Sequence, residues 1–291
     1  MKKIMVVLSM LLLLLLTSAC VVSFGGFEAD LTRTSGEVIE KEFDIEAVEA
    51  VEIDGFGVMH YRVGDTPSLE IEAEEGYLDN LEVIVTSSRL IIRPERTWLG
   101  GFVATTTPHY YLTLPSLEEL TLSGAVKFNA DEMISEKLLI LCNGGNDLTI
   151  EQIEAADVTL KAAGAAIWTI DKISADDIEI EINGMTNAVL GDMQAESFEL
   201  VINGAASATV AGDVQTQMVE INGTGTYEAG DLRSSDVTVK VSGASSIIVW
   251  AVDDLHLDCD GAGKIDYWGA PRVTQDNAGL TVINSLGEKE D

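Results

Sequence analysis

Cysteine and histidine are the residues of this sequence best suited to covalent chemistry, and the chain has three of each. A cysteine nucleophile needs a partner that removes its proton, most often a histidine. Of His60, His109 and His256, only His256 lies close to a cysteine, three residues before Cys259. In a strand, residues three apart point to opposite faces. The sequence therefore predicts no cysteine nucleophile, and no other catalytic residue stands out.

Carboxylates are the most abundant ionisable groups, since 49 Asp and Glu oppose 17 Lys and Arg in a formal net charge of −32. This charge argues against nucleic acid as a partner, because phosphate binding needs clustered cations. Acidic residues could gather divalent cations, and Gly-Asp pairs recur at Gly191-Asp192, Gly212-Asp213 and Gly230-Asp231. These pairs lack the spacing of a calcium-binding repeat, and a turn explains them more simply. We expect no metal site and no cofactor.

One irregular stretch, from Pro94 to Pro108, carries side chains that could contact a ligand. Its aromatic residues Trp98 and Phe102, with Tyr110 just after it, could bind a sugar or a protein surface. Alternatively, the stretch folds over the core or the end of the domain. We take Trp98, Phe102 and Tyr110 as candidate contacts to a glycan or to an envelope protein.

The N-terminal segment, up to Cys20, resembles a signal for export. Two lysines precede an apolar run at 4–16, which is too short to span a bilayer comfortably. The run leads into Leu16-Thr17-Ser18-Ala19-Cys20, which resembles a bacterial lipobox, although leucine is usual where Thr17 stands. We predict a signal peptide at 1–19, a lipidated Cys20 and a tether at 20–36. The exported protein would then be anchored to the cell membrane or outer envelope; an ordinary secretory signal is the alternative.

A glycine that follows a small or polar residue recurs along the chain at nearly constant spacing. These marker glycines are Gly124, Gly144, Gly164, Gly184, Gly204, Gly223, Gly243, Gly261 and Gly279. Successive markers are separated by about 20 residues, and a period of this size indicates stacked repeats. In such a stack no unit can bury its apolar face alone.

Apolar and polar residues alternate on both sides of each marker glycine, as expected for strands with one buried face. The position two residues before the marker is occupied by Leu122, Cys142, Ala162, Ile182, Ile202, Ile221, Val241 and Cys259. Both cysteines therefore belong to a buried column, where thiols are inert. They lie six repeats apart, and at roughly 4.8 Å per layer that separation is too large for a disulfide.

These patterns predict an all-β fold, a single-stranded parallel β-helix (β-solenoid) of about 20 residues per coil. No proline falls between 116 and 270, as strand pairing between coils requires. We expect a right-handed coil, as in most parallel crossovers. Regular coils should fill 116–285. Residues 37–115 should form divergent coils or an antiparallel cap within the same domain (37–285), and 286–291 a charged tail.

Several segments of the chain are similar to a bacterial family named "putative auto-transporter adhesin, head GIN domain". The similarity lies in units such as Ile202-Asn203-Gly204-Ala205 and Val241-Ser242-Gly243-Ala244, in the closing segment 260–271, and in the opening segments 43–63 and 69–73. It covers about residues 38–284. Some repeats depart from the usual Ser-Gly-Ala form and have Asn-Gly-Met or Asn-Gly-Gly. The resemblance implies a β-helix on an exported or lipid-anchored protein, and it brings no catalytic residues with it.

The sequence thus predicts a non-catalytic lipoprotein of the cell envelope, adhesin-like or otherwise ligand-binding or structural, with a rigid elongated surface. One alternative is a glycan-active lyase or hydrolase. Such β-helix enzymes build a cleft from long loops and paired carboxylates, and the nearly constant spacing of the marker glycines leaves little room for those loops. The other alternative is an accessory or sensor lipoprotein of an envelope-stress pathway.

Overall fold

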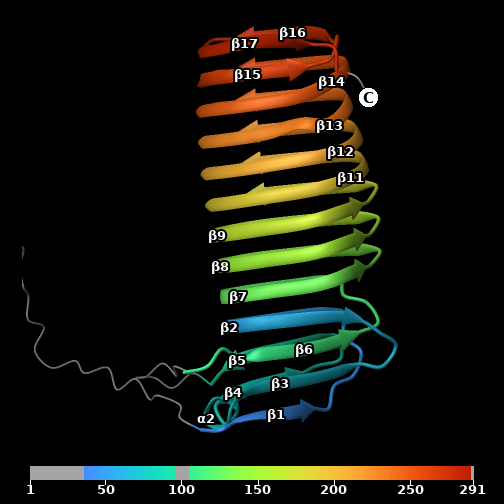
Figure 1. Cartoon of the computed structure of the whole chain (residues 1–291), viewed down its shortest axis with the longest axis vertical. Helices are drawn as coiled ribbons and strands as arrows, with labels where there is room; N and C mark the ends of the chain where they lie inside the picture. The colour runs from blue at the N-terminus through green and yellow to red at the C-terminus, as the bar shows by residue number, and fades with distance from the viewer. Residues whose placement is uncertain (1–35, 96–104, 290–291) are drawn as a thin grey trace, which may run out of the picture.

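The structure, a computed structural model that describes residues 36–95 and 105–289, is a parallel β-solenoid (Figure 1). Each coil pairs in parallel with the next. In the middle of the stack Asp177 is the register partner of Ser197, and near the C-terminus the slightly shorter coils pair Ala244 with Ala262. The predicted fold class is confirmed, and the spacing of the marker glycines is the period of the coils.

The regular coils contain eleven of the strands in the described part of the chain. They are β7 (Glu119–Ile134), β8 (Lys137–Glu154), β9 (Asp157–Ser174), β10 (Asp177–Ile182), β11 (Met185–Ile202), β12 (Ala205–Ile221), β13 (Thr224–Val241), β14 (Ala244–Cys259), β15 (Ala262–Trp268), β16 (Arg272–Asn277) and β17 (Leu280–Gly287). The sequence pattern suggests two short strands in each repeat. In β11 to β14 the structure instead joins the second strand of one repeat to the first strand of the next, because the corner between them stays paired with the neighbouring coils. Strands β7, β8 and β9 run through their own marker glycines.

The inward-facing side chains form continuous columns through the solenoid. Ile182, Ile202 and Ile221 are register partners in successive coils, and each is fully buried. Burial of one such side chain contributes about 1.5–3 kcal/mol. Because the columns repeat in every coil, the core runs along the whole stack.

The marker glycines stack on one another at a corner of the coils. Gly124, Gly144 and Gly164 are register partners and adopt positive φ angles of 97°, 133° and 140°. Later markers lack such angles, but a Cβ on Gly204 would lie 3.0 Å from the Gly184 nitrogen and closer still to its carbonyl oxygen. The backbones of successive coils therefore pass too close here for any side chain.

The N-terminal region contains both structures that the sequence left open. Its elements are β1 (Val38–Phe43), β2 (Ala50–Val63), β3 (Ser68–Glu74), α2 (Glu75–Leu78), β4 (Leu81–Val85), β5 (Arg89–Pro94) and β6 (His109–Leu114). Strand β2 continues the parallel stack, with Gly55 opposite Gly124 of β7, and β5 and β6 pair in parallel with its other edge. Strands β1, β3 and β4 add antiparallel pairings that form a cap.

The C-terminal coil, β16 and β17, is exposed on its outer side (Figure 1). The predicted charged tail begins too early, because Leu286 and Gly287 still belong to β17. The strand extends this far because it pairs with β15 up to Trp268. Beyond it, the Lys289 ammonium lies 4.7 Å from the centre of the Trp250 ring and binds Asp231.

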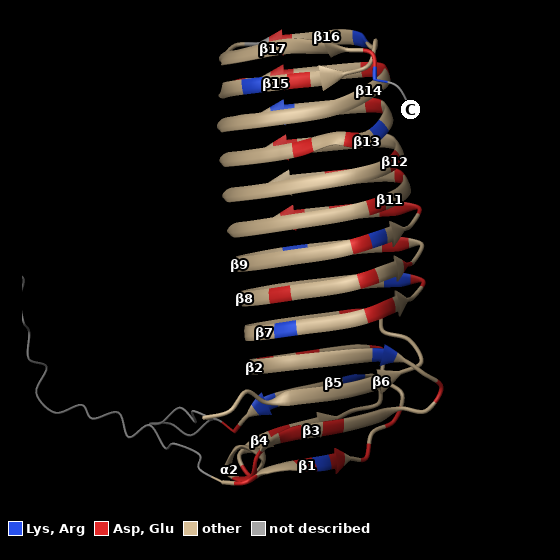
Figure 2. Ribbon diagram, viewed as in Figure 1, with Lys and Arg blue, Asp and Glu red and all other residues tan. Residues whose placement is uncertain are grey.

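Charged residues are unevenly distributed over the stack. Figure 2 shows many of them toward the edge at which the arrows of β7, β8 and β9 end, and few along the opposite edge. Within the described ranges the structure contains no helix long and apolar enough to cross a membrane.

Candidate functional site

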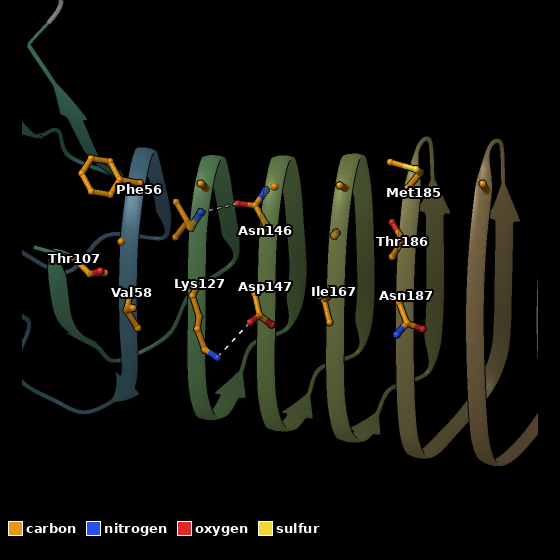
Figure 3. A pocket seen from close by; sticks show the side chains of 17 residues that line it. Phe56, Val58, Thr107, Lys127, Asn146, Asp147, Ile167, Met185, Thr186 and Asn187 are labelled. Atoms are coloured by element: carbon orange, nitrogen blue, oxygen red, sulfur yellow. Dashed lines mark hydrogen bonds and ion pairs between the residues drawn. The ribbon is translucent and has the colours of Figure 1, made fainter. Parts of the chain in front are cut away.

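A groove runs along the solenoid next to the stacked marker glycines (Figure 3). It has a volume of about 870 Å³. Its coil residues stand one, two or three positions after a marker glycine, or after Gly55, in six successive layers. They are Phe56, Gly57, Val58, Ala125, Val126, Lys127, Gly145, Asn146, Asp147, Ala165, Ala166, Ile167, Met185, Thr186, Asn187 and Ala205, and Thr107 completes the lining. At about 4.8 Å per layer, the distance from Phe56 to Met185 is about 19 Å.

Small outward-facing residues create the hollow of this groove. The position directly after the marker holds Ala125, Gly145 and Ala165 in three consecutive coils, and all three are exposed. Phe56 stands in the same row on one side of them and Met185, 65% exposed, on the other. The large side chains thus close the ends of a trough whose floor is backbone and methyl groups.

Two buried polar side chains lie beneath the floor. Asn146 accepts a hydrogen bond from the Val126 amide and donates one to the Leu122 carbonyl, both at 3.3 Å. The Thr186 hydroxyl is buried and has no hydrogen-bond partner among residues 36–95 and 105–289. A buried hydroxyl without a partner costs about 1–3 kcal/mol.

One ion pair forms part of the side wall. Lys127 Nζ lies 3.3 Å from Asp147 Oδ2, and both side chains are partly exposed. Such a pair contributes at most about 1 kcal/mol. Because Lys127 and Asp147 are the ionisable residues among those that line the groove, the site suits binding of an extended and mostly apolar ligand better than acid–base chemistry.

A second, more acidic depression of about 570 Å³ lies over the strand segments before the marker glycines. Three of its carboxylates are held by cations: Glu119 by Arg89, Asp157 by Lys137 and Glu179 by Lys161, at 2.9, 3.1 and 3.0 Å. Among the described residues, no three His, Cys, Asp or Glu side chains are placed to hold a metal ion. This depression is an ion-paired strand surface.

The structure describes one of the three predicted ligand contacts. Tyr110 is 1% exposed, and its hydroxyl donates to the Phe56 carbonyl and lies 2.7 Å from the Tyr77 hydroxyl. Burial raises the pKa of Tyr110. The buried position excludes direct ligand contact, so that prediction is wrong: the alternation of β6 directs Tyr110 inward and Tyr111 outward. Trp98, Phe102 and Cys20 lie outside the described residues.

Cys142 and Cys259, the cysteines in the described part of the chain, are free and buried, as their place in the column predicts. Burial raises the pKa of the Cys142 thiol to about 11, so at neutral pH this side chain is a protonated, apolar group. Burial also raises the pKa of Cys259. Neither thiol reaches the groove.

The groove residues were not predicted as a site. The available signal is the small residue that follows successive markers, in Ser-Gly-Ala, Asn-Gly-Gly and Ala-Gly-Ala. Each triplet by itself is a turn. A continuous groove forms only because the coils stack in register, so that the short side chains of successive coils lie next to one another.

Comparison with protein families identifies a family that matches two stretches of the chain. The family described as "Putative auto-transporter adhesin, head GIN domain" matches residues 47–171 and again 159–271. Among curated proteins, none matches this chain significantly.

Three solved structures share the fold. A putative adhesin from Parabacteroides merdae ATCC 43184 is 18% identical with a TM-score of 0.66, over 88% of this chain and 99% of that one. A putative adhesin from Parabacteroides distasonis ATCC 8503 is 18% identical with a TM-score of 0.65, over 88% and 100%. A putative lipid binding protein from the same strain is 17% identical with a TM-score of 0.63, over 87% and 98%. At these identities the likeness concerns the fold.

Proposed function

Since the chain belongs to the "Putative auto-transporter adhesin, head GIN domain" family, we propose that it is a non-catalytic, lipid-anchored binding protein of the cell envelope. In this role Cys20 carries the lipid anchor. The rigid stack of coils holds the groove open, and the groove binds an extended ligand of the envelope or of a neighbouring surface.

The observation that carries this proposal is the continuous groove over six coils. Its outward row of Ala125, Gly145 and Ala165 lets a ligand approach the backbone closely, and Phe56 and Met185 offer apolar contacts at its ends. Most ligand sites are concave and apolar with a few placed polar groups. Lys127 and Asp147, which form an ion pair, are such groups here.

The kinds of residue in the groove favour binding over catalysis. General acid–base catalysis needs a group that gains and loses a proton near the reacting atoms. The carboxylate of Asp147 is already paired with Lys127. The apolar lining accommodates an acyl chain or the apolar faces of sugar rings, and one relative of this fold is described as a putative lipid binding protein.

The proposal can be tested by blocking the groove with a bulky side chain. The Ala165→Phe substitution places a ring on the floor, whereas Ala244→Phe puts the same ring at the equivalent position of a coil outside the groove, where Ala244 is also exposed. The full chain, purified in detergent, is screened on a glycan array and in flotation with phospholipid vesicles, and the products are assayed for new reducing ends. We expect wild type and Ala244→Phe to bind one class of ligand, Ala165→Phe to lose at least tenfold in affinity, and no product to form.

Two results would overturn the proposal. If Ala165→Phe and wild type bound the ligand equally well, the groove would not be the binding site. Turnover of a polysaccharide would identify the chain as a glycan-active enzyme instead.

A further inference from the structure

Two of the three histidines of the chain meet on the outer face of the N-terminal cap. His60 lies on β2 and His109 begins β6, and His60 Nε2 is 3.3 Å from His109 Nδ1, so that the two rings form a hydrogen bond. The ring planes are nearly parallel, with an angle of 7° between them. Both side chains are only partly buried, so the pair exchanges protons with solvent.

This hydrogen bond lasts only while one of the two facing nitrogens lacks a proton. A neutral imidazole has one nitrogen that donates and one that accepts, whereas an imidazolium donates from both. One proton between the rings therefore joins them, and a second one drives them apart. Histidine is the side chain whose charge ordinarily changes between about pH 5 and pH 8. We propose that His60 and His109 form a pH-sensitive latch between β2 and β6, which is closed at neutral pH and opens when acidification protonates both rings.

The latch lies where β6 begins. Strands β2 and β6 pair along Val58–Val63 and His109–Leu114, and the Val58 amide donates to the Pro108 carbonyl at 2.9 Å just before the strand starts. The end of a strand opens more readily than its centre. A side-chain bond between the two strands therefore has its largest effect at this place.

The charged and titratable groups around the pair come from five strands. On the same outer face they are Glu40 and Glu42 of β1, Arg62 of β2, Glu70 and Glu72 of β3, Tyr111 of β6, and Lys127 and Asp131 of β7. Glu72 is the register partner of His109 and accepts from the Tyr111 hydroxyl at 3.4 Å. A protonated His109 that leaves His60 thus has a carboxylate on the neighbouring strand to pair with.

The protonation of His60 in the folded chain agrees with this device. Burial, followed by the charges of His109 and Arg62, lowers the pKa of His60 from its ordinary value of 6.5. The unfolded chain therefore takes up this proton more readily than the folded chain does. Stability supplied by the neutral ring is complete above pH 6.5 and is lost as the pH falls through the lower, folded pKa.

The test has to be local, because acidification also relieves the repulsion of a chain with a net charge of −32. The full chain, labelled with ¹⁵N-histidine and purified in detergent, is titrated by NMR. His109→Gln and His109→Ala should each raise the titration midpoint of His60 by at least about half a pH unit, because neither replacement becomes charged. His256→Gln, which removes the exposed histidine of β14, should leave it unchanged.

Hydrogen exchange, corrected for its intrinsic pH dependence, measures the opening of the latch. In wild type, peptides that cover 56–63 and 106–114 should exchange about tenfold faster at pH 5.0 than at pH 7.5, the change expected for one pKa unit. In His60→Gln the two rates should be equal. Circular dichroism confirms that each variant is folded.

Two results would overturn the proposal. One is an equal His60 midpoint in wild type and in both His109 variants, since the rings would then titrate independently. The other is exchange at β2 and β6 that responds to pH equally in wild type and in His60→Gln. This inference is independent of the proposed function, because both measurements are made without a ligand.

Discussion

Glycine is required at the corner of each coil because the carbonyl oxygen of the previous coil fills the space of a side chain. At Gly204 this oxygen belongs to Gly184. The residue after a marker is under no such restriction: at Gly145 the nearest atom to an added Cβ is 4.0 Å away. These two kinds of glycine can be told apart by experiment.

Gly204→Ala should destabilise the protein by about 1–3 kcal/mol, because the added methyl group forces two coils apart. Gly145→Ala, one position after its marker, should change the free energy of unfolding by less than about 0.5 kcal/mol. Urea denaturation followed by circular dichroism measures both. If the two substitutions had the same effect, the close approach of the coils at the marker would not be what demands glycine.

Neighbouring coils are also joined by polar side chains on the outside of the elements. The Asn203 amide donates to Asn183 Oδ1 at 2.9 Å, the Asn222 amide to Asn203 Oδ1 at 3.1 Å, and the Ser242 hydroxyl to Asn222 Oδ1 at 2.8 Å. Each bond contributes about 0.5–1.5 kcal/mol. This ladder runs beside the marker glycines and reinforces the same register.

The last coil differs from the others at its inward positions. Gln275 of β16 is the register partner of Leu257, and Thr281 of β17 that of Gly263. No coil follows in the described structure, so the exposed Gln275 side chain lies at the end of a column that continues below it with Leu257 and Val239. Terminal repeats with a polar outer face keep solenoids soluble.

Gln275→Leu should therefore promote association of the chain through this end. Thr274→Leu adds the same side chain to the neighbouring position of β16, the register partner of the exposed His256, and should have little effect. Dynamic light scattering over a range of protein concentrations compares the two. Equal behaviour of the variants would show that the polar residue at the end of the column is not a cap.

The two ends of the molecule lie far apart. Strand β1 of the cap is at one end of the stack and the coil of β16 and β17 at the other (Figure 1). If Cys20 is lipidated, the cap faces the membrane and the C-terminal coil points away from it. The groove and the histidine pair would then belong to the half of the solenoid nearer the membrane.

Cys20→Ser should abolish labelling of the chain by a fatty-acid analogue and release it from the membrane fraction. Cys142→Ser is the matched control, because that thiol is buried in the folded chain and cannot carry the anchor. Metabolic labelling followed by fractionation measures the outcome. A Cys20→Ser chain that stayed labelled and membrane-bound would contradict the anchor.

The period and the buried columns could be predicted from sequence because each coil repeats the same local pattern. Ile182, Ile202 and Ile221 are recognisable from alternation and spacing alone, and the structure stacks them as neighbours. Tyr110 was misplaced for the opposite reason. It follows an irregular stretch, where no repeat gives the phase that turns Tyr110 inward.

By itself the sequence determined the coil, its period, its glycine corners and the burial of both cysteines, because those features follow from residues close in the chain. Only the tertiary structure decided the groove, the order of strands in the cap and the meeting of His60 with His109. Each of these depends on residues from different coils or cap strands that lie side by side in space. The separation of such residues along the chain does not by itself show that they meet.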